Sequence, residues 1–475
     1  KLSVCVLRVC GWSDRLWASS SVDLRTHHTT RFGIDGGKVL CLLLSWPASM
    51  TLLAVLLLLF FALMGAPLFA VLLGASMLGF YSAEIELAAV AIELYRIVDT
   101  PLLVALPLFT FSGYVLSAAG TSQRLVAVFQ SVFGMIPSGL AIVAFFACAV
   151  FTALTGASGV TIVALGALLL PALQSAGFGE RFSLGLVTTS GSLGLLLVPS
   201  VPLILYGVIA QQLDLGPSFT MTELFVAGLV PMFLMLFCLS VWTLVKYSGG
   251  QIPTVPFSGS KLKAALWNAR WEIPLPLVVL GGIFGGFLAI SEAAAMTALY
   301  VVIIEVFFYR EVSLRDLTVI GKDSMVMVGG ILLILGVALA FTNYLVDAEV
   351  PQMIMSWLKE YITNPLFFLL MLNILLLALG AVLDIFSALV IMVPLLLPVA
   401  VSYGIHPVHL GIIFLANLQV GYFTPPVGMN LFIASYRFKK PLTELYSATL
   451  PFMVILLFAV MIITYVPFLS LWHIG

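Results

Sequence analysis

Long apolar runs follow one another along almost the whole chain, separated by short polar segments or by segments rich in glycine and proline. Several runs reach about 18 residues or more, which is the length that an α-helix needs to cross about 30 Å of hydrocarbon. The sequence lacks the alternating segments of about ten residues that are typical of membrane β-barrels. The pattern therefore predicts an all-α polytopic membrane protein embedded in a lipid bilayer.

Two stretches, residues 155–200 and 383–428, interrupt the apolar pattern in the same way. Five pairs of glycine, proline or small polar residues in these stretches share one separation of 227 positions: Pro171 and Pro398, Gly177 and Gly404, Ser190 and Asn417, Gly194 and Gly421, and Pro199 and Pro426. Apolar segments that are broken at matching positions of two halves indicate the binding site of a transporter. The sequence thus predicts an internal repeat built around a site.

Each half is expected to contain a helical hairpin followed by a broken helix. The predicted boundaries are 50–246 for the first repeat, with its hairpin near 137–176 and its broken helix near 182–210, and 273–475 for the second repeat, with its hairpin near 365–402 and its broken helix near 411–437. A polar cytoplasmic linker at 247–272 separates the two repeats.

Basic residues in three short loops predict the orientation of the chain, because lysine and arginine concentrate on the cytoplasmic side. These residues are Lys246, Lys261, Lys263 and Arg270 in one loop, Arg310, Arg315 and Lys322 in the second, and Arg437, Lys439 and Lys440 in the third. All three loops fall on one side if residues 154–160 and 383–389 are the tips of re-entrant hairpins. The two repeats then have inverted topology. Full crossings at both turns are an alternative that the loop charges also tolerate.

Residues 1–49 differ from the rest of the chain. They contain six lysines or arginines and three of the five cysteines, and no amphipathic period is visible. The strong apolar pattern begins at Met50. We therefore expect the natural start at Met50, with a cytoplasmic extension as the alternative.

Composition agrees with a membrane protein and narrows its chemistry. Of 475 residues, 62% are hydrophobic and 9% charged, whereas soluble domains carry about 25% charged residues. The net charge of −1 does not suggest a nucleic-acid partner. The cysteines lack metal-ligand or disulfide spacing, and no Walker A sequence implies ATP. Neither a cofactor nor an intramembrane catalytic pair of acids is expected.

The broken segments offer two kinds of binding chemistry. Non-helical backbone cannot face lipid, because each unpaired N–H or C=O group costs several kcal/mol there. Such backbone survives where it lines a cavity, and its carbonyls together with nearby hydroxyls can hold Na⁺. Helix N-termini at the same place present N–H groups to an anion such as a carboxylate. The oxygen-bearing residues are Thr155, Ser158 and Thr161 in the first half, and Asp384, Ser387, Asn417 and Thr424 in the second.

Four ionisable residues within or beside apolar sequence need an interpretation. A carboxylate in a membrane segment is costly, so Asp384 is predicted to lie in an ion or substrate site. Glu292 either has a functional role or caps the helix that follows it. His406 and His409 flank Pro407 and are expected in an external loop rather than as ligands.

The segment GAVLDIFSALVIMVPLLLPVAVSYGIHPVHLGIIFLANLQVGYFTPPVGMNLF resembles the C-terminal signature of the large membrane subunit of TRAP (tripartite ATP-independent periplasmic) transporters. The shared features are the LD pair, PxxxP, GI-x-PVH-x-G, N-x-x-x-G and TPPVG-x-N. The runs FTALTGASGVTIVALGALLLPAL, GSLGLLLVPSVPLILYG and GGIFGGFLAISEAAAMTALY also resemble their family counterparts. The resemblance extends from about Met50 to the end of the chain.

The resemblance implies an elevator-type importer of small organic acids (a C4-dicarboxylate, a sugar acid or a similar carboxylate) in a bacterial or archaeal cytoplasmic (inner) membrane. Na⁺ would be the coupling ion. A periplasmic substrate-binding protein would deliver the substrate, and a small four-helix TRAP membrane subunit would be the second partner. A stand-alone Na⁺/carboxylate symporter with a related pair of hairpins and a membrane assembly subunit without transport activity are the alternatives.

The resemblance also implies which residues form the sites. The first Na⁺ site would comprise Ser158, Thr161, Ser190, Gly191 and Gly194, and the second Asp384, Ser387, Asn417, Gly421 and Thr424. The substrate would lie between the two tips, near Thr155, Gly156, Ser192, Pro199, Pro425 and Pro426. The chain departs from the usual pattern at Thr155 and Ala157, where serines are common, and at Val198, where a proline is common.

Overall fold

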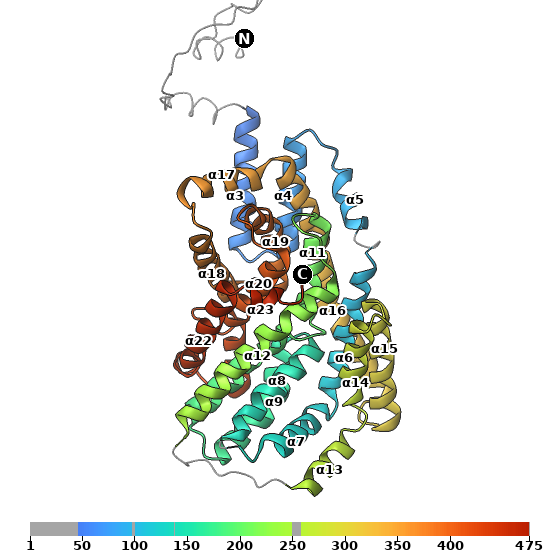
Figure 1. Cartoon of the computed structure of the whole chain (residues 1–475). Helices are drawn as coiled ribbons and strands as arrows, with labels where there is room; N and C mark the ends of the chain where they lie inside the picture. Colours follow the sequence, from blue (N-terminus) through green and yellow to red (C-terminus); the bar gives the residue numbers. More distant parts are fainter. Residues whose placement is uncertain (1–45, 97–99, 137, 249–257, 475) are drawn as a thin grey trace, which may run out of the picture. The chain divides into compact units, whose positions relative to one another are not determined.

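Figure 1 shows the computed structural model, which describes residues 46–96, 100–136, 138–248 and 258–474. Every regular element in these ranges is helical. The prediction about residues 1–49 lies almost entirely outside the described residues, although a helix begins at Trp46, before Met50. The chain divides into two compact units, residues 1–87 and 88–475, which are described separately.

The first unit contains a helical pair, α3 (Trp46–Leu63) and α4 (Leu68–Ser82). The long apolar run that begins near Met50 is therefore broken, as expected from its glycine and proline. Gly65 adopts a left-handed φ of 85°, which glycine reaches without steric cost, and Pro67 immediately precedes α4.

In the second unit, helices up to residue 246 form the first half of the transporter-like pattern. They are α5 (Ala88–Arg96), η2 (Pro101–Val104), α6 (Ala105–Ala118), α7 (Thr121–Phe133), α8 (Gly139–Thr155), α9 (Ser158–Ser175), α10 (Glu180–Ser190), η3 (Leu193–Leu196), α11 (Val201–Leu213) and α12 (Met221–Lys246). Helices α8 and α9 occupy the predicted first hairpin and pack on each other. Helices α10, η3 and α11 occupy the predicted broken helix.

The second half begins with a helix inside the predicted linker. Its elements are α13 (Gly259–Asn268), α14 (Pro274–Phe284), α15 (Ile290–Val302) with its π-helical continuation η4 (Ile303–Phe308), α16 (Leu314–Asp347), α17 (Val350–Tyr361), α18 (Pro365–Val382), α19 (Ile385–Ser402), α20 (Pro407–Gly421), α21 (Met429–Phe438), α22 (Leu442–Tyr465) and α23 (Phe468–Leu471). Helices α18 and α19 occupy the second hairpin. Helices α20 and α21 occupy the second broken helix.

Local sequence explains several helix starts. Helix α12 begins with a capping box in which Thr220 accepts a hydrogen bond from the Glu223 N–H and the Glu223 carboxylate accepts one from the Thr220 N–H. The Glu292 carboxylate accepts a hydrogen bond from the Ala289 N–H at 2.9 Å, at the start of α15. Of the two interpretations of Glu292, the structure supports the helix cap.

Helix α20 lies in the core of the second unit, with every residue from Pro407 to Gly421 buried. Helices α18 and α22 pack against it. The prediction that His409 lies in an external loop is wrong, because α20 begins at Pro407 and His409 is only 2% exposed. His406 precedes the helix, and its ring nitrogen caps the Val408 N–H.

Seven helices in the described part of the chain are long and apolar enough to cross a membrane. Two bent pairs would raise this number to nine, namely Leu102–Ala118 with Thr121–Phe133 at 78° and Glu180–Leu196 with Val201–Leu213 at 40°. The second bent pair carries the first predicted break.

Candidate functional site

The first hairpin turns within two residues at its tip. Helix α8 ends at Thr155, Gly156 adopts a left-handed φ of 69°, and Ala157 is the extended N-cap of α9. The alanine side chain cannot accept a hydrogen bond, and α9 has no side-chain cap. Because the first N–H groups of an α-helix have no partner within the helix, the first tip presents backbone donors beside Ser158 that no described side chain caps.

Hydroxyl groups connect the first hairpin to the first broken helix. The Thr152 and Thr161 hydroxyl oxygens are 2.7 Å apart, and the Thr152 hydroxyl donates to the Gly191 carbonyl at 2.8 Å. The Ser158 hydroxyl donates to the Asn430 amide oxygen at 2.8 Å. The structure therefore brings Thr161 to the break at Gly191, whereas the Ser158 hydroxyl joins the first tip to α21 of the second half. Sequence reasoning missed Thr152 and Asn430, although Thr152 lies only three residues before Thr155.

The second tip is organised around a carboxylate. Asp384 is the N-cap of α19, and its Oδ2 accepts hydrogen bonds from the N–H groups of Phe386 at 3.1 Å and Ser387 at 3.0 Å. The Ser387 hydroxyl donates to Oδ1, and the Ile385 N–H donates to the Tyr422 hydroxyl at 2.6 Å. Asp384 and Ser387 thus lie together, and helix amides stabilise the negative charge.

Both breaks pack closely against the first helix of their own hairpin, through glycines that are 227 positions apart. A Cβ atom on Gly194 would lie 2.0 Å from the Ala149 carbonyl oxygen, and one on Gly421 would lie 2.6 Å from the Gly380 Cα. Each break also contains a cis peptide bond, before Pro199 and before Pro426. Only glycine fits at either contact, so these two residues set how near each break lies to its hairpin.

The two breaks also meet each other. The Ser192 hydroxyl donates to the Gln419 carbonyl at 3.0 Å, and these residues are themselves 227 positions apart. Both side chains are fully buried. This contact joins the first broken helix to α20 and brings the two interrupted segments into one packed region.

Three predicted ion-site residues have their side chains engaged elsewhere. The Asn417 amide nitrogen donates to the Asn373 amide oxygen at 2.6 Å and to a carbonyl of its own helix. The hydroxyls of Ser190 and Thr424 donate to carbonyls four residues earlier, at 2.6 and 2.9 Å. Within the described residues, no hydrogen bond joins these side chains to Ser158 or Asp384. The Asn417 amide oxygen is buried without a hydrogen-bond partner in that part of the chain.

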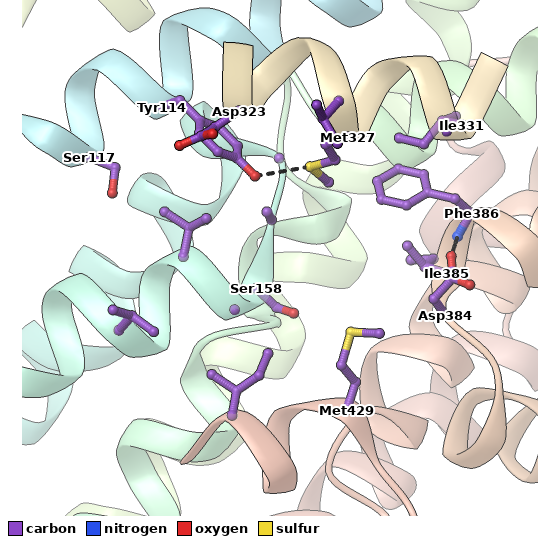
Figure 2. A pocket seen from close by; sticks show the side chains of 18 of the residues that line it. Tyr114, Ser117, Ser158, Asp323, Met327, Ile331, Asp384, Ile385, Phe386 and Met429 are labelled. Carbon is purple, nitrogen blue, oxygen red and sulfur yellow. Dashed lines mark hydrogen bonds between the residues drawn. The ribbon is translucent and has the colours of Figure 1, made fainter. Parts of the chain in front are cut away.

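A pocket of about 870 Å³ lies between the two tips and helix α16. Its lining includes Gly156 to Gly159 from the first tip and Asp384 to Phe386 from the second. Figure 2 shows Ser158 and Asp384 in this pocket together with side chains from α6 and α16. The volume falls within the range of about 300–1,000 Å³ that is typical of ligand pockets. The pocket is therefore large enough for a small organic molecule.

Of the six residues predicted to bind substrate, Gly156 lines this pocket. Among the described residues, the pocket lining does not include the other five, which are Thr155, Ser192, Pro199, Pro425 and Pro426. The lining instead contains residues that sequence reasoning missed, namely Tyr114 and Ser117 on α6 and Asp323 on α16. The Tyr114 hydroxyl contacts the Met327 sulfur at 3.3 Å. Asp323 lies between Lys322 and Ser324 rather than inside an apolar run, so the signal that selected Asp384 does not select it.

A second charged group lies away from the pocket and was also missed. The Arg124 guanidinium on α7 pairs with Glu272 at 2.5 Å, with Glu311 at 2.6 Å and with Glu305 at 3.4 Å. Burial raises the pKa of Glu272 even though Arg124 opposes this shift. Partial burial of Glu311 acts in the same direction, but hydrogen bonds from Arg124 and the Gly120 N–H outweigh it and lower the pKa of Glu311. The cluster ties α7 to the segments around α14 and α15.

The sequence profile described as "Tripartite ATP-independent periplasmic transporter, DctM component" matches residues 42–469. The C4-dicarboxylate TRAP transporter large permease protein DctM of Rhodobacter capsulatus is 34% identical over 400 residues, covering 82% of this chain and 91% of that protein. The isethionate TRAP transporter permease protein DctMQ of Oleidesulfovibrio alaskensis is 34% identical over 386 residues, covering 80% of this chain and 59% of that protein.

A solved structure shares the fold. The chain superimposes on the crystal structure of the Alcanivorax borkumensis YdaH transporter with a TM-score of 0.56. The superposition covers 81% of this chain and 87% of the YdaH chain. The sequences are only 16% identical, so this likeness concerns the fold alone.

Proposed function

Because this chain belongs to the DctM-component family of tripartite ATP-independent periplasmic transporters, we propose that it moves small organic acids across the membrane with Na⁺ as the coupling ion. Family membership makes the chain a multi-pass inner-membrane protein and a transporter subunit rather than an enzyme. The substrate, the ion and the mechanism of movement are our proposals.

The pocket between the two tips is the observation that carries this proposal. On its first side, α9 starts without a side-chain cap, and Ser158 lines the space. Backbone N–H groups at a helix N-terminus bind anions, because unpaired donors and the helix dipole act together there. We place the substrate carboxylate at this first tip. Its negative charge then needs no arginine or lysine from the pocket wall.

We place Na⁺ at oxygen-rich positions beside each tip. For the second site we propose the group Asp384, Ser387, Asn417, Gly421 and Thr424, in which Asp384 supplies the formal charge. For the first site we propose Ser158, Thr161, Ser190, Gly191 and Gly194, together with Thr152, which touches both Thr161 and the Gly191 carbonyl. Carbonyls of unwound segments are common Na⁺ ligands in transporters.

We also propose two partners and an elevator-type motion. The family description is tripartite, which supports a small four-helix membrane subunit and a periplasmic binding protein as the other components. The relative named DctMQ extends well beyond the region matched by this chain, which agrees with a second membrane component. The hydrogen bond between Ser192 and Gln419 joins the two broken helices. In the proposed motion, these two broken helices move together as one body relative to α16.

Uptake by proteoliposomes tests the proposal. The full chain would be reconstituted with a small membrane subunit and a periplasmic binding protein of the same transport system, and uptake of labelled succinate and 4-aminobutanoate would be measured in parallel. An inward Na⁺ gradient should drive uptake of at least one acid, and choline in place of Na⁺ should abolish it. Uptake that proceeds equally well without Na⁺ would contradict Na⁺ coupling. Full Na⁺-driven uptake without the binding protein would favour the stand-alone symporter.

A further inference from the structure

The charged side chains that line the pocket are both acidic. They are Asp323 on α16 and Asp384 at the second tip, and the described residues contribute no lysine or arginine to the lining. A cleft lined by charge of one sign produces a field that acts on every charged ligand inside it. The pocket should therefore discriminate between small molecules by their charge.

The two aspartates differ in how their charge is compensated. Both carboxylate oxygens of Asp384 accept hydrogen bonds, from two backbone N–H groups and the Ser387 hydroxyl. Asp323 is exposed to the pocket, and its carboxylate has neither a hydrogen bond nor an ion pair within the described residues. The uncompensated charge of the pocket is thus concentrated at Asp323.

Asp323 also lies on a different wall from the tips. In Figure 2 it lies beside Tyr114 on the α6 and α16 side, whereas Ser158 and Asp384 belong to the two hairpins. A molecule whose carboxylate occupies the first tip would point its other end toward the remaining space. That end would then be exposed to the field of Asp323.

We infer that Asp323 is a specificity-determining residue, which favours substrates with a cationic remote end over substrates with a second carboxylate. The preferred class is a zwitterionic organic acid, in which an ammonium or amidinium group lies opposite the carboxylate. This inference rests on the proposed function, since it places the substrate carboxylate at the first tip. The physical reason is Coulomb attraction or repulsion across a pocket whose effective dielectric constant is well below that of water.

Three probes with the same four-carbon chain test this inference. They are 4-aminobutanoate with an ammonium end, butanoate with a methyl end and succinate with a carboxylate end. Binding to the full chain in lipid nanodiscs would be measured by calorimetry or competition at saturating Na⁺. We expect 4-aminobutanoate to bind at least about tenfold more tightly than succinate, with butanoate between them.

Variants of Asp323 separate charge from structure. Asp323→Asn should reduce the tenfold preference to within about threefold, Asp323→Lys should reverse it, and Asp323→Glu should preserve it. Asp347→Asn is the matched control, because Asp347 ends the same helix but lies outside the pocket lining. This control should leave the preference unchanged. If Asp323→Asn does not fold, the comparison of Asp323→Glu with Asp323→Lys still tests the sign of the charge.

Each other outcome has a definite meaning. Tighter binding of succinate by the wild-type chain, or an unchanged preference in Asp323→Asn and Asp323→Lys, would overturn the inference and leave the proposed function standing. A change in Na⁺ dependence without a change in probe order would also overturn it, since Asp323 would then act on the ion. Failure of all three probes to bind would contradict the carboxylate site itself, and the inference with it.

Discussion

The two hairpin tips occupy corresponding positions of the sequence, yet they have opposite chemistry. At the first tip, Ala157 leaves the N-terminus of α9 uncapped. At the second tip, the Asp384 carboxylate accepts hydrogen bonds from the N–H groups of Phe386 and Ser387. The Tyr422 hydroxyl accepts one from the Ile385 N–H. One tip therefore offers free donors, and the other offers a negative charge surrounded by donors that are already used.

This difference is the basis of the different tasks that we propose for the two similar hairpins. Free N–H groups attract a carboxylate, whereas a capped carboxylate with hydroxyls and carbonyls nearby attracts a cation. The repeat supplies a common scaffold, and the side chain at each helix start sets whether the backbone donors of that tip stay uncapped or bind a carboxylate of the chain itself. Four predictions follow this comparison from the largest expected effect to the smallest.

The shared scaffold depends on the glycine contacts of the two breaks. Gly194→Ala should lower stability by about 3 kcal/mol, because the new Cβ would overlap backbone that cannot rotate away. Gly421→Ala should cost about 2 kcal/mol, since its nearest atom lies farther away. Thermal unfolding in detergent measures both. Gly329→Ala is the matched control, because a Cβ there would meet nothing within 4 Å. Equal stability of all three variants would show that the close packing is absent.

Adding a cap to the first tip should make it resemble the second. Ala157→Asp places a carboxylate at an extended N-cap position, so it should stabilise the protein by about 1 kcal/mol. The same carboxylate would occupy the free N–H groups and repel the substrate, so uptake should fall about thirtyfold, or about 2 kcal/mol. Proteoliposome uptake and thermal unfolding measure the two effects. The neutral cap in Ala157→Ser should reduce uptake less. Normal uptake by Ala157→Asp would move the substrate carboxylate away from this tip.

Removing the charge from the second tip should weaken ion binding rather than folding. Asn caps a helix about as well as Asp, so Asp384→Asn should retain the start of α19. It should raise the Na⁺ concentration for half-maximal uptake about tenfold, or about 1.4 kcal/mol. Titration of uptake against Na⁺ at matched protein levels measures this change. An unchanged Na⁺ dependence would make Asp384 a structural cap only, and the second site would then consist of carbonyls and hydroxyls.

The smallest effect concerns the pair Ser190 and Asn417 at matching positions of the repeat. Asn417→Ala removes a buried hydrogen bond to Asn373 and should cost about 1 kcal/mol of stability. Its effect on Na⁺ dependence should have the same direction as that of Asp384→Asn but be smaller. Ser190→Ala removes a bond to the Leu186 carbonyl of its own helix and one with the Cys148 thiol, and it should lower stability less than Asn417→Ala does. A larger Na⁺ effect in Asn417→Ala than in Asp384→Asn would shift the centre of the second ion site toward α18.

Much of the architecture follows from local sequence. Apolar length predicted the helices, and glycine and proline marked the breaks at 191–200 and 422–428, because these residues change which backbone angles and hydrogen bonds are available wherever they occur. The repeat with its separation of 227 positions also pairs Gly194 with Gly421. In the structure, both glycines pack closely against a helix of their hairpin. The family followed from motifs that are contiguous in the chain.

Side-chain partners depended on the tertiary structure. The sequence predicted an external loop for His409, whereas the folded chain buries this residue within α20. Arg124 acquires its three glutamate partners only through the packing of distant segments. Asp323 likewise became relevant only when α16 was seen to form a wall of the pocket.

The difference between what local sequence determined and what tertiary packing decided has a physical cause. Hydrophobic length and backbone restriction act within a few residues, so the order of apolar and breaking residues in the sequence determined the helices, the hairpins and the positions of the breaks. The environment of a polar side chain is set by helices that pack against it from more than a hundred positions away, as Ser158 meets Asn430 and Ser192 meets Gln419. The N-cap residues Ala157 and Asp384 determined in the sequence which tip has uncapped donors and which has a compensated charge, because a cap acts within three residues. Only the tertiary structure decided that both tips line one pocket together with Asp323.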